Sequence, residues 1–307
     1  MVVAEQLTLA GTVELRGVGV HSGASSHIRI SGADADAGIL FQSMGRNRRR
    51  PSMRAEWRRV TKTELCTTIS DGEGFTVATI EHLMSALAGL GVDNALVEID
   101  GPEVPILDGS AALFVEALDD CGLVGLGSAR KFVRVLKSVR IERGAAYCLL
   151  SPNGGGFHLD VAIDFATGPV GRQRKALAVT PESYRNKIAK ARTFGDVADL
   201  KTLLAMGFAR GSSLENTIAL DGETVLNPEG LRFPDEFIRH KALDAVGDLA
   251  LAGLPLLADY RASRPGHAMN CAILAALFAD SDAYEIIEPS LSAIRTPVER
   301  FPAMARA

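Results

Sequence analysis

The chain has 307 residues, of which 47% are hydrophobic and 23% charged, and its net charge is −4. This composition is typical of a globular protein and excludes disordered, collagen-like and coiled-coil chains. The acidic balance argues against a protein that binds nucleic acid through its overall charge. At roughly 150 residues per domain, the length predicts two domains.

The cysteines and the apolar stretches bear on the cellular compartment. The four cysteines contain no C-x-x-C pair, so neither a disulfide framework nor a cysteine zinc site is expected. The longest uncharged apolar stretches, 249–258 and 268–279, are shorter than the about 20 residues that a bilayer requires. The N-terminal residues do not resemble a signal peptide. We therefore expect a cytoplasmic protein without an integral membrane segment.

The first third of the chain is typical of strands and turns, and a glycine-rich turn is expected over 17–23. The arginine-dense segment Arg46–Arg59 is interpreted as a solvated loop, with contact to a phosphorylated substrate or a nucleic acid as the alternatives. Its single aromatic residue, Trp57, weakens the nucleic-acid alternative. Strands are expected over residues 7–15, 27–30, 65–69 and 75–78.

The first clear helix is expected over 80–90, where apolar residues recur at helical spacing. Thr79 is a candidate N-cap, and Gly91 is a candidate stop. A buried strand is expected over 95–99, and a second helix over 110–118.

The glycine-rich segment 122–128 is interpreted as a linker, because the pattern of strands followed by helices begins again after it. Both halves therefore predict α+β domains of similar plan, at 1–127 and 128–307. In the second half, strands are expected over 132–135, 139–142, 146–150 and 157–165, and helices over 181–191, 197–205, 236–251 and 268–278.

A polar stripe on the helix expected over 236–251 carries the strongest chemical signal. His240, Asp244 and Asp248 are four residues apart, so they share one face of this helix. An imidazole and a carboxylate at this spacing can reach one metal ion, and nitrogen with oxygen ligands suits zinc. The alternative is a helix-surface pair that contributes a few tenths of a kcal/mol. Polar groups on an otherwise apolar helix need partners, which weakens this alternative but leaves it open.

Two further segments carry ionisable side chains. Glu81 and His82 lie near a helix start, where a histidine could complete a three-ligand zinc site while its neighbour acts as a base. The alternative is a solvated helix face. His267 follows a glycine in a tight loop, so we expect it to be exposed enough to titrate and able to act as a general acid. The alternative is an ordinary turn residue.

Seven segments, in order along nearly the whole chain, resemble the UDP-3-O-acyl-N-acetylglucosamine deacetylases. They include Thr-Ile-Glu-His-Leu at 79–83, Ala-Arg-Thr-Phe-Gly at 191–195 and the stretch around His-Lys-Ala-Leu-Asp at 235–248. Several independent motifs in order are far more specific than any one alone. The remaining segments lie at 93–94, 103–110, 226–233 and 266–270.

The resemblance implies a fold of two similar α+β domains, with helices sandwiched between the sheets. It also implies an enzyme of lipid A biosynthesis that uses one Zn²⁺ per chain to remove the N-acetyl group of a UDP-acyl-sugar. By this resemblance the small-molecule substrate is the partner, no nucleic acid is bound, and the chain is a monomer. The implied zinc ligands are His82, His240 and Asp244.

The resemblance also implies the roles of other residues. Glu81 is the general base and His267 the general acid, while Asp248 orients His267. Thr193 and Lys241 lie near the reacting carbonyl. Phe194 contacts the sugar. A β-α-β insert at about 195–222 forms a passage for the acyl chain, with the residues Val197, Leu200, Ala209, Leu214 and Ala219.

One position departs from the family pattern, and two other functions stay open. The family usually carries an aromatic or apolar residue after Thr-Phe-Gly, where this chain has Asp196. A zinc amidase for another acylated substrate would show no dependence on the acyl chain. A non-catalytic homologue that binds a ligand in the same pocket would lack a metal ligand or the base, and this chain lacks neither.

Overall fold

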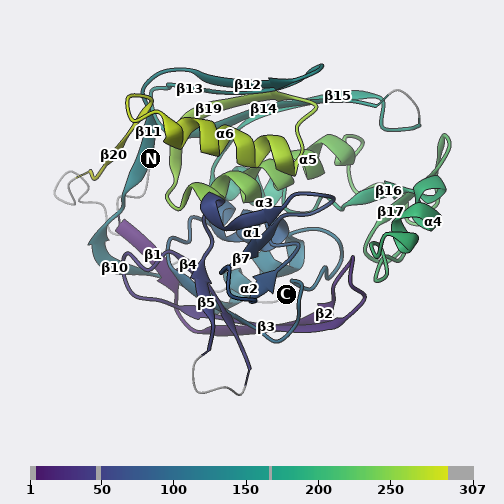
Figure 1. Cartoon of the computed structure of the whole chain (residues 1–307), viewed down its shortest axis with the longest axis horizontal. Coiled ribbons are helices and arrows are strands. Elements are labelled where there is room, and N and C mark those ends of the chain that lie inside the picture. Colours follow the sequence, from purple (N-terminus) through teal and green to yellow (C-terminus); the bar gives the residue numbers. More distant parts are fainter. Residues whose placement is uncertain (1–4, 46–49, 166–167, 290–307) are drawn as a thin grey trace, which may run out of the picture.

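Two β-sheets form the outer layers of the molecule, and helices fill the space between them (Figure 1). The structure is a computed structural model that describes residues 5–45, 50–165 and 168–289. One sheet belongs to the N-terminal half and has the order β2 (Thr12–Val18), β3 (Ser25–Gly32), β9 (Ala95–Ile99), β4 (Ile39–Ser43) and β5 (Ser52–Arg54). The layered α+β arrangement confirms the predicted fold class.

The sheet of the C-terminal half is built around β19 (Leu256–Ser263). Its neighbours are β13 (Ala146–Ser151), which runs antiparallel, and β14 (Phe157–Asp164), which runs parallel. The remaining strands are β12 (Val139–Arg143), β15 (Arg172–Val179), β11 (Phe132–Val135) and β20 (Tyr284–Ile287).

Both halves repeat one strand topology. In the N-terminal sheet, β9 lies between the antiparallel β3 and the parallel β4, as β19 lies between β13 and β14. The outer hairpin partners β2 and β5 correspond to β12 and β15. The pair β1 (Glu5–Leu9) and β10 (Leu123–Ala129) matches the antiparallel pair β11 and β20.

Two helices of each half lie between the sheets. These are α1 (Glu81–Leu90) and α2 (Ala112–Cys121) in the first half, and α5 (Glu236–Leu249) and α6 (His267–Ala279) in the second. Their apolar side chains belong to one buried cluster that continues from half to half. Among the residues that the structure describes, no helix is both long and apolar enough to span a bilayer.

The crossing of α1 and α5 joins the two halves. A Cβ atom at Gly247 would lie 2.0 Å from the carbonyl oxygen of Glu81, so only glycine lets the helices approach this closely. Nearby, the Ser85 hydroxyl donates to the carbonyl of Leu243 at 2.7 Å and accepts from the Tyr184 hydroxyl at 2.8 Å. The distance between the two helices is therefore set by backbone contact.

The halves differ in the segment that precedes the first sandwiched helix. In the N-terminal half, this segment contains η1 (Trp57–Arg59) and the small sheet of β6 (Val60–Lys62), β7 (Thr68–Ser70) and β8 (Thr76–Val77). In the C-terminal half, it contains α3 (Pro181–Lys187), β16 (Phe194–Asp196), α4 (Val197–Ala205), β17 (Ile218–Asp221) and β18 (Thr224–Val225).

Within the second of these segments, β16, α4 and β17 form a β-α-β unit over the residues where the resemblance implies an insert. Strand β16 pairs in parallel with β17, and α4 connects them. Asp196, the departure from the family pattern, caps α4 by accepting a hydrogen bond from the backbone N–H of Ala198 at 2.8 Å. An acidic residue is well suited to a helix N-cap, which gives this residue a structural reason.

Several sequence-based expectations are wrong in detail. The segment interpreted as a linker forms β10, because β1 supplies a pairing edge for it. Thr79 does not cap α1: it has a φ of 55°, and its hydroxyl donates to Glu103 instead. The strand expected over 65–69 begins only at Thr68, and the helix expected over 181–191 ends at Lys187.

The arginine-dense segment Arg46–Arg59 is not one continuous loop. Residues 46–49 lie outside the described residues, but β5 and η1 follow them. The guanidinium of Arg50 donates to the Glu98 carboxylate at 2.6 Å. Part of this charge is therefore neutralised on the N-terminal sheet.

Candidate metal and catalytic site

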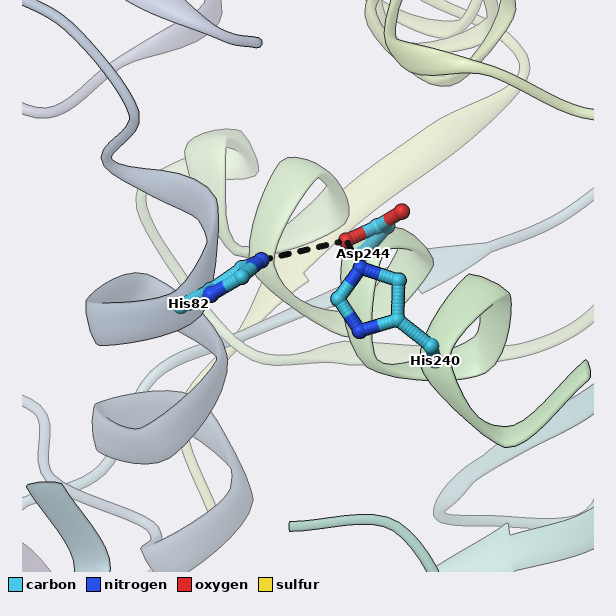
Figure 2. A group of neighbouring side chains, drawn as sticks. All are labelled: His82, His240 and Asp244. Carbon is cyan, nitrogen blue, oxygen red and sulfur yellow. Dashed lines mark ion pairs between the residues drawn. The ribbon is translucent and has the colours of Figure 1, made fainter. Parts of the chain in front are cut away.

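Three side chains from α1 and α5 converge where these helices cross (Figure 2). His82 comes from the first turn of α1, and His240 and Asp244 come from successive turns of α5. The Oδ1 atom of Asp244 lies 3.3 Å from Nε2 of His240 and 3.7 Å from Nε2 of His82. The predicted metal ligands are thus brought together, and one ligand atom of each lies within 4.8 Å of the others.

The donor set fits a cation. All three residues are at most 4% exposed, which contradicts the alternatives of a solvated helix face and a helix-surface pair. Among the described residues, Oδ1 of Asp244 and Nδ1 of His82 have no hydrogen-bond partner although both are buried. A buried carboxylate oxygen without a partner is costly, and a bound cation would remove that cost. Two imidazoles and one carboxylate are a donor set typical of zinc.

Protonation also favours metal binding. Burial, reinforced by the neighbouring His240, lowers the pKa of the His82 imidazole to about 3, and burial likewise lowers the pKa of His240. Burial opposes ionisation of Asp244, but the neighbouring His240 and Lys241 outweigh it and hold the pKa of this carboxyl well below its usual range. The site therefore presents two neutral imidazoles and one carboxylate, the forms that ligate metals.

Glu81 is the first residue of α1, directly before His82, and is 3% exposed. Its Oε2 accepts the backbone N–H of Thr67 at 3.0 Å, and its Oε1 lies 3.8 Å from Nε2 of His267. Burial raises the pKa of Glu81 to about 7, against the opposing influence of His267. A carboxylate with a pKa near neutrality is able to accept and release a proton.

His267 is the first residue of α6, and its side chain is only 10% exposed, so the expectation of an exposed loop residue is wrong. Its Nδ1 lies 2.9 Å from Oδ2 of Asp248. Burial alone would lower the pKa of His267, but the carboxylates of Asp248 and Glu81 outweigh it and raise this pKa to about 10. The imidazole is therefore held in its protonated form at neutral pH.

Asp248 is held in place by hydrogen bonds from residues other than His267. It accepts hydrogen bonds from the Thr67 hydroxyl at 2.6 Å and from the Asn270 amide at 2.8 Å. Thr67 directly precedes β7, so it links the N-terminal half to α5 of the C-terminal half. The sequence analysis missed both Thr67 and Asn270, since neither stands in a pattern with the residues that it contacts.

Lys241 and Phe194 border the metal-ligand cluster. The Lys241 ammonium donates to Oδ2 of Asp244 at 2.8 Å and lies 5.6 Å from the centre of the Phe194 ring. Phe194 also packs edge-on against His240, with ring centres 6.2 Å apart. Thr193 precedes it, and the Thr193 backbone donates to Gly109 and accepts from Ile218, both at 2.8 Å. These residues form one wall of the site.

The predicted passage residues lie farther out, on the insert. Helix α4 has no buried residue, and Leu200 and Leu214 are 38% and 44% exposed. Met206 is 53% exposed. The insert therefore carries apolar side chains that are open to solvent next to Phe194. The residues named for this passage are Val197, Leu200, Ala209, Leu214 and Ala219.

A buried ion pair behind the site was also missed. Arg192 and Glu236 are both at most 1% exposed, and Nε of Arg192 donates to Oε1 of Glu236 at 3.0 Å. Glu236 stands four residues before His240, so the stripe of His240, Asp244 and Asp248 extends by one turn. That spacing is the signal that could have identified Glu236.

Comparison with known proteins agrees with this geometry. The sequence model of a family described as "LpxC: UDP-3-O-acyl N-acetylglycosamine deacetylase" matches residues 6–279. Proteins of Brucella ovis and Brucella canis, each named UDP-3-O-acyl-N-acetylglucosamine deacetylase, are 46% identical to the chain over 286 residues. The match to each covers 93% of this chain and 99% of the relative. A Brucella melitensis protein of the same name matches equally well.

Proposed function

The chain belongs to the LpxC family of UDP-3-O-acyl-N-acetylglucosamine deacetylases, and from this membership we propose a specific reaction for it. The enzyme hydrolyses the N-acetyl group of UDP-3-O-acyl-N-acetylglucosamine with the help of one Zn²⁺. The products are acetate and UDP-3-O-acyl-glucosamine, and the reaction is an early step of lipid A biosynthesis. The observation that carries this proposal is the buried cluster of His82, His240 and Asp244, flanked by Glu81 and His267.

His82, His240 and Asp244 would hold the metal ion. When bound, zinc supplies Lewis-acid chemistry, because it lowers the pKa of a water molecule and polarises a carbonyl group. The Ala191 carbonyl faces Nδ1 of His240 at 3.1 Å, so this nitrogen carries the proton and Nε2 keeps its lone pair for the metal. Lys241 neutralises the second oxygen of Asp244.

Glu81 and His267 divide the proton transfers. Glu81, with a pKa of about 7, takes a proton from the attacking water. His267, held protonated by Asp248, gives its proton to the nitrogen of the departing amine. The backbone of Thr67 orients Glu81, and the hydroxyl of Thr67 orients Asp248. Thr67 thus orients the proposed base directly and the proposed acid through Asp248.

Thr193 and Lys241 stabilise the negative charge that develops on the carbonyl oxygen. A fixed donor in a site shielded from water is worth more than in bulk water, because it does not reorganise as the charge forms. Phe194 lies beside His240 and Lys241, where its ring can pack against the glucosamine. The reacting group is thereby held between α5 and β16.

The exposed apolar side chains of the insert receive the acyl chain. Exposed apolar surface of this kind is typical of a ligand-binding site, and a fatty acyl chain is the apolar part of the proposed substrate.

Two alternative functions can be distinguished from this proposal by experiment. A zinc amidase for another acylated substrate would not depend on the 3-O-acyl chain, and a non-catalytic homologue would bind the substrate without releasing acetate.

An assay of acetate release tests the proposal. The purified chain is given UDP-3-O-acyl-N-acetylglucosamine or UDP-N-acetylglucosamine, before chelation, after chelation and after addition of Zn²⁺. We expect release from the acylated substrate, loss on chelation and recovery with Zn²⁺. Equal rates on both substrates would favour the amidase. Release that is insensitive to the chelator would overturn the proposed role of the metal.

A further inference from the structure

The proposed reaction uses neither Arg192 nor Glu236, although burying this ion pair is expensive. Removing two charges from water costs several kcal/mol per ion unless further hydrogen bonds compensate it. Here the compensation is extensive. Glu236 accepts the backbone N–H of Arg232, and the Arg192 guanidinium donates to the carbonyl of Gly230 at 2.7 Å and to the Glu229 carboxylate. The pair therefore ties two segments, 191–192 and 229–232, to the first turn of α5.

One peptide group connects this ion pair to the metal-ligand cluster. The N–H of the peptide between Ala191 and Arg192 donates to Oε1 of Glu236 at 3.0 Å. The carbonyl of the same peptide faces Nδ1 of His240 at 3.1 Å. Glu236 and His240 are four residues apart on α5, so both ends of a planar group are held by one face of one helix.

We propose that Arg192 and Glu236 are positioning residues that orient the Ala191–Arg192 peptide and thereby select the tautomer of His240. With the peptide fixed, its carbonyl accepts only from a protonated Nδ1, so Nε2 is left unprotonated toward Asp244 and His82. A peptide free to turn would let the proton move to Nε2, and the metal would then have to displace it. This inference rests on the proposed function for the identity of the ligands.

The ion pair of Arg192 and Glu236 also fixes the start of the segment that contains Thr193 and Phe194. Thr193 follows Arg192 directly, and its own backbone is held by Gly109 and Ile218. Loss of the anchor at Glu236 would free the Ala191–Arg192 peptide and leave Thr193 held by Gly109 and Ile218 alone. The expected result is a weaker metal site and a lower turnover, with a smaller effect on the binding of substrate.

The test variant is Glu236→Gln, which keeps the size of the side chain. The amide places an NH₂ where the carboxylate accepted hydrogen bonds from both Arg192 and Arg232, so one donor is left facing another donor. We expect the affinity for Zn²⁺, measured by competition with a chromogenic chelator, to fall about tenfold or more. Nitrogen NMR of the metal-free protein should show a mixture of His240 tautomers in place of the Nδ1–H form alone.

Asp93 supplies the matched control. It too is a largely buried carboxylate, with a side chain 9% exposed, that accepts from an arginine, Arg130 at 2.7 Å, and from a backbone N–H, that of Leu7 at 2.9 Å. It lies in the N-terminal half, away from the metal-ligand cluster. Asp93→Asn should lower the free energy of unfolding and leave Zn²⁺ affinity and the His240 tautomer unchanged. An equal loss of affinity in this control would overturn the proposal.

A second variant keeps the test informative if Glu236→Gln does not fold. Arg192→Lys retains the positive charge and loses the planar fork, so its Zn²⁺ affinity should lie between those of the wild type and Glu236→Gln. Wild-type affinity and a single His240 tautomer in the folded variants would refute the proposal. The tautomer is read without substrate or metal, so a failure of acetate release in the wild type would instead count against the proposed function.

Discussion

The two halves share a strand topology but divide the chemistry unequally. In both, the central strand lies between one antiparallel and one parallel neighbour, and a helix precedes it. Helix α1 brings only Glu81 and His82, at its first turn. Helix α5 carries a full polar stripe, and α6 begins with His267, whereas its counterpart α2 begins with Ala112. A repeated scaffold thus produces one site, at the crossing where the halves meet.

The segments that precede α1 and α5 differ between the halves, and they place different residues around the candidate site. In the N-terminal half, the residue just before β7 is Thr67, which holds Glu81 and Asp248. In the C-terminal half, the β-α-β insert supplies Phe194 and exposed apolar side chains. The first segment holds the residues proposed to transfer protons, and the second borders the site where substrate is proposed to bind. The repeated helices thus carry the candidate site residues, and the segments that differ supply contacts around them.

The largest loss of activity is expected from a substitution at Glu81, the proposed base at the start of α1. Glu81→Gln removes the proposed base but keeps an oxygen for the N–H of Thr67, so the fold and the metal site should persist. Turnover should fall by about 10²- to 10⁴-fold, the usual contribution of general-base catalysis. Acetate release gives the rate, and elemental analysis gives the Zn²⁺ content. Near-normal turnover with full Zn²⁺ would show that α1 contributes a ligand only.

The contact between the halves can be broken at Gly247. A Cβ atom there would lie 2.0 Å from the carbonyl oxygen of Glu81, so Gly247→Ala must push α1 away from α5. We expect a loss of about 1 to 3 kcal/mol in the free energy of unfolding of the metal-free protein, together with weaker Zn²⁺ binding. Denaturant titration measures the first, and chelator competition the second.

Gly154→Ala is the control for this substitution, because a Cβ atom at Gly154 meets nothing within 4 Å. It should leave both quantities close to those of the wild type. If Gly247→Ala behaves like the control, the helix crossing does not set the geometry of the site.

The support of His267 by α5 can be tested through the pH profile. Asp248→Asn removes the carboxylate that raises the pKa of His267, so this pKa should fall from about 10. A general acid works only while it is protonated, so activity is lost as the pH rises through this pKa. The alkaline limb of kcat/KM should therefore move to lower pH in the variant. An unmoved limb would mean that another group donates the proton.

The smallest effect is expected on the insert. Leu200→Ser places a hydroxyl in the proposed passage, and the loss of about 1 to 3 kcal/mol in apolar contact should raise KM for long-chain substrates. KM for short-chain substrates should stay near that of the wild type. Leu113 on α2 is equally exposed, at 38%, so Leu113→Ser is the matched control. A uniform rise in KM for all chain lengths would remove the insert from acyl binding.

Local patterns predicted the elements that periodicity governs. Strand β11 and helix α4 have the predicted bounds, α1 begins one residue later than predicted, and α6 extends one residue further at each end. Strand β10 was mistaken for a linker because glycines weaken the strand pattern, and only pairing with β1 reveals it. Such long-range pairing is not encoded in the spacing of one segment.

The site was predictable where residues share a helix face or a family motif, and unpredictable where contacts join distant segments. The stripe of His240 and Asp244 follows from helical spacing alone. By contrast, Thr79 was assigned as a cap because threonine favours that position, yet Glu103 captures its hydroxyl. His267 was expected to be exposed because it follows a glycine, but the packing of α6 against α5 buries it.

The helix crossing also determines when, during synthesis of the chain, the residues of the candidate metal site can come together. The ribosome delivers Glu81 and His82 early, as part of a half that has its own sheet and helices. Neither side chain can approach His240 or Asp244 until α5 has been synthesised and Gly247 has packed against α1. A chain cut between β10 and α5 would hold the proposed base and one proposed ligand, and we expect no hydrolysis from it. The last sandwiched helix to be synthesised, α6, brings the proposed acid.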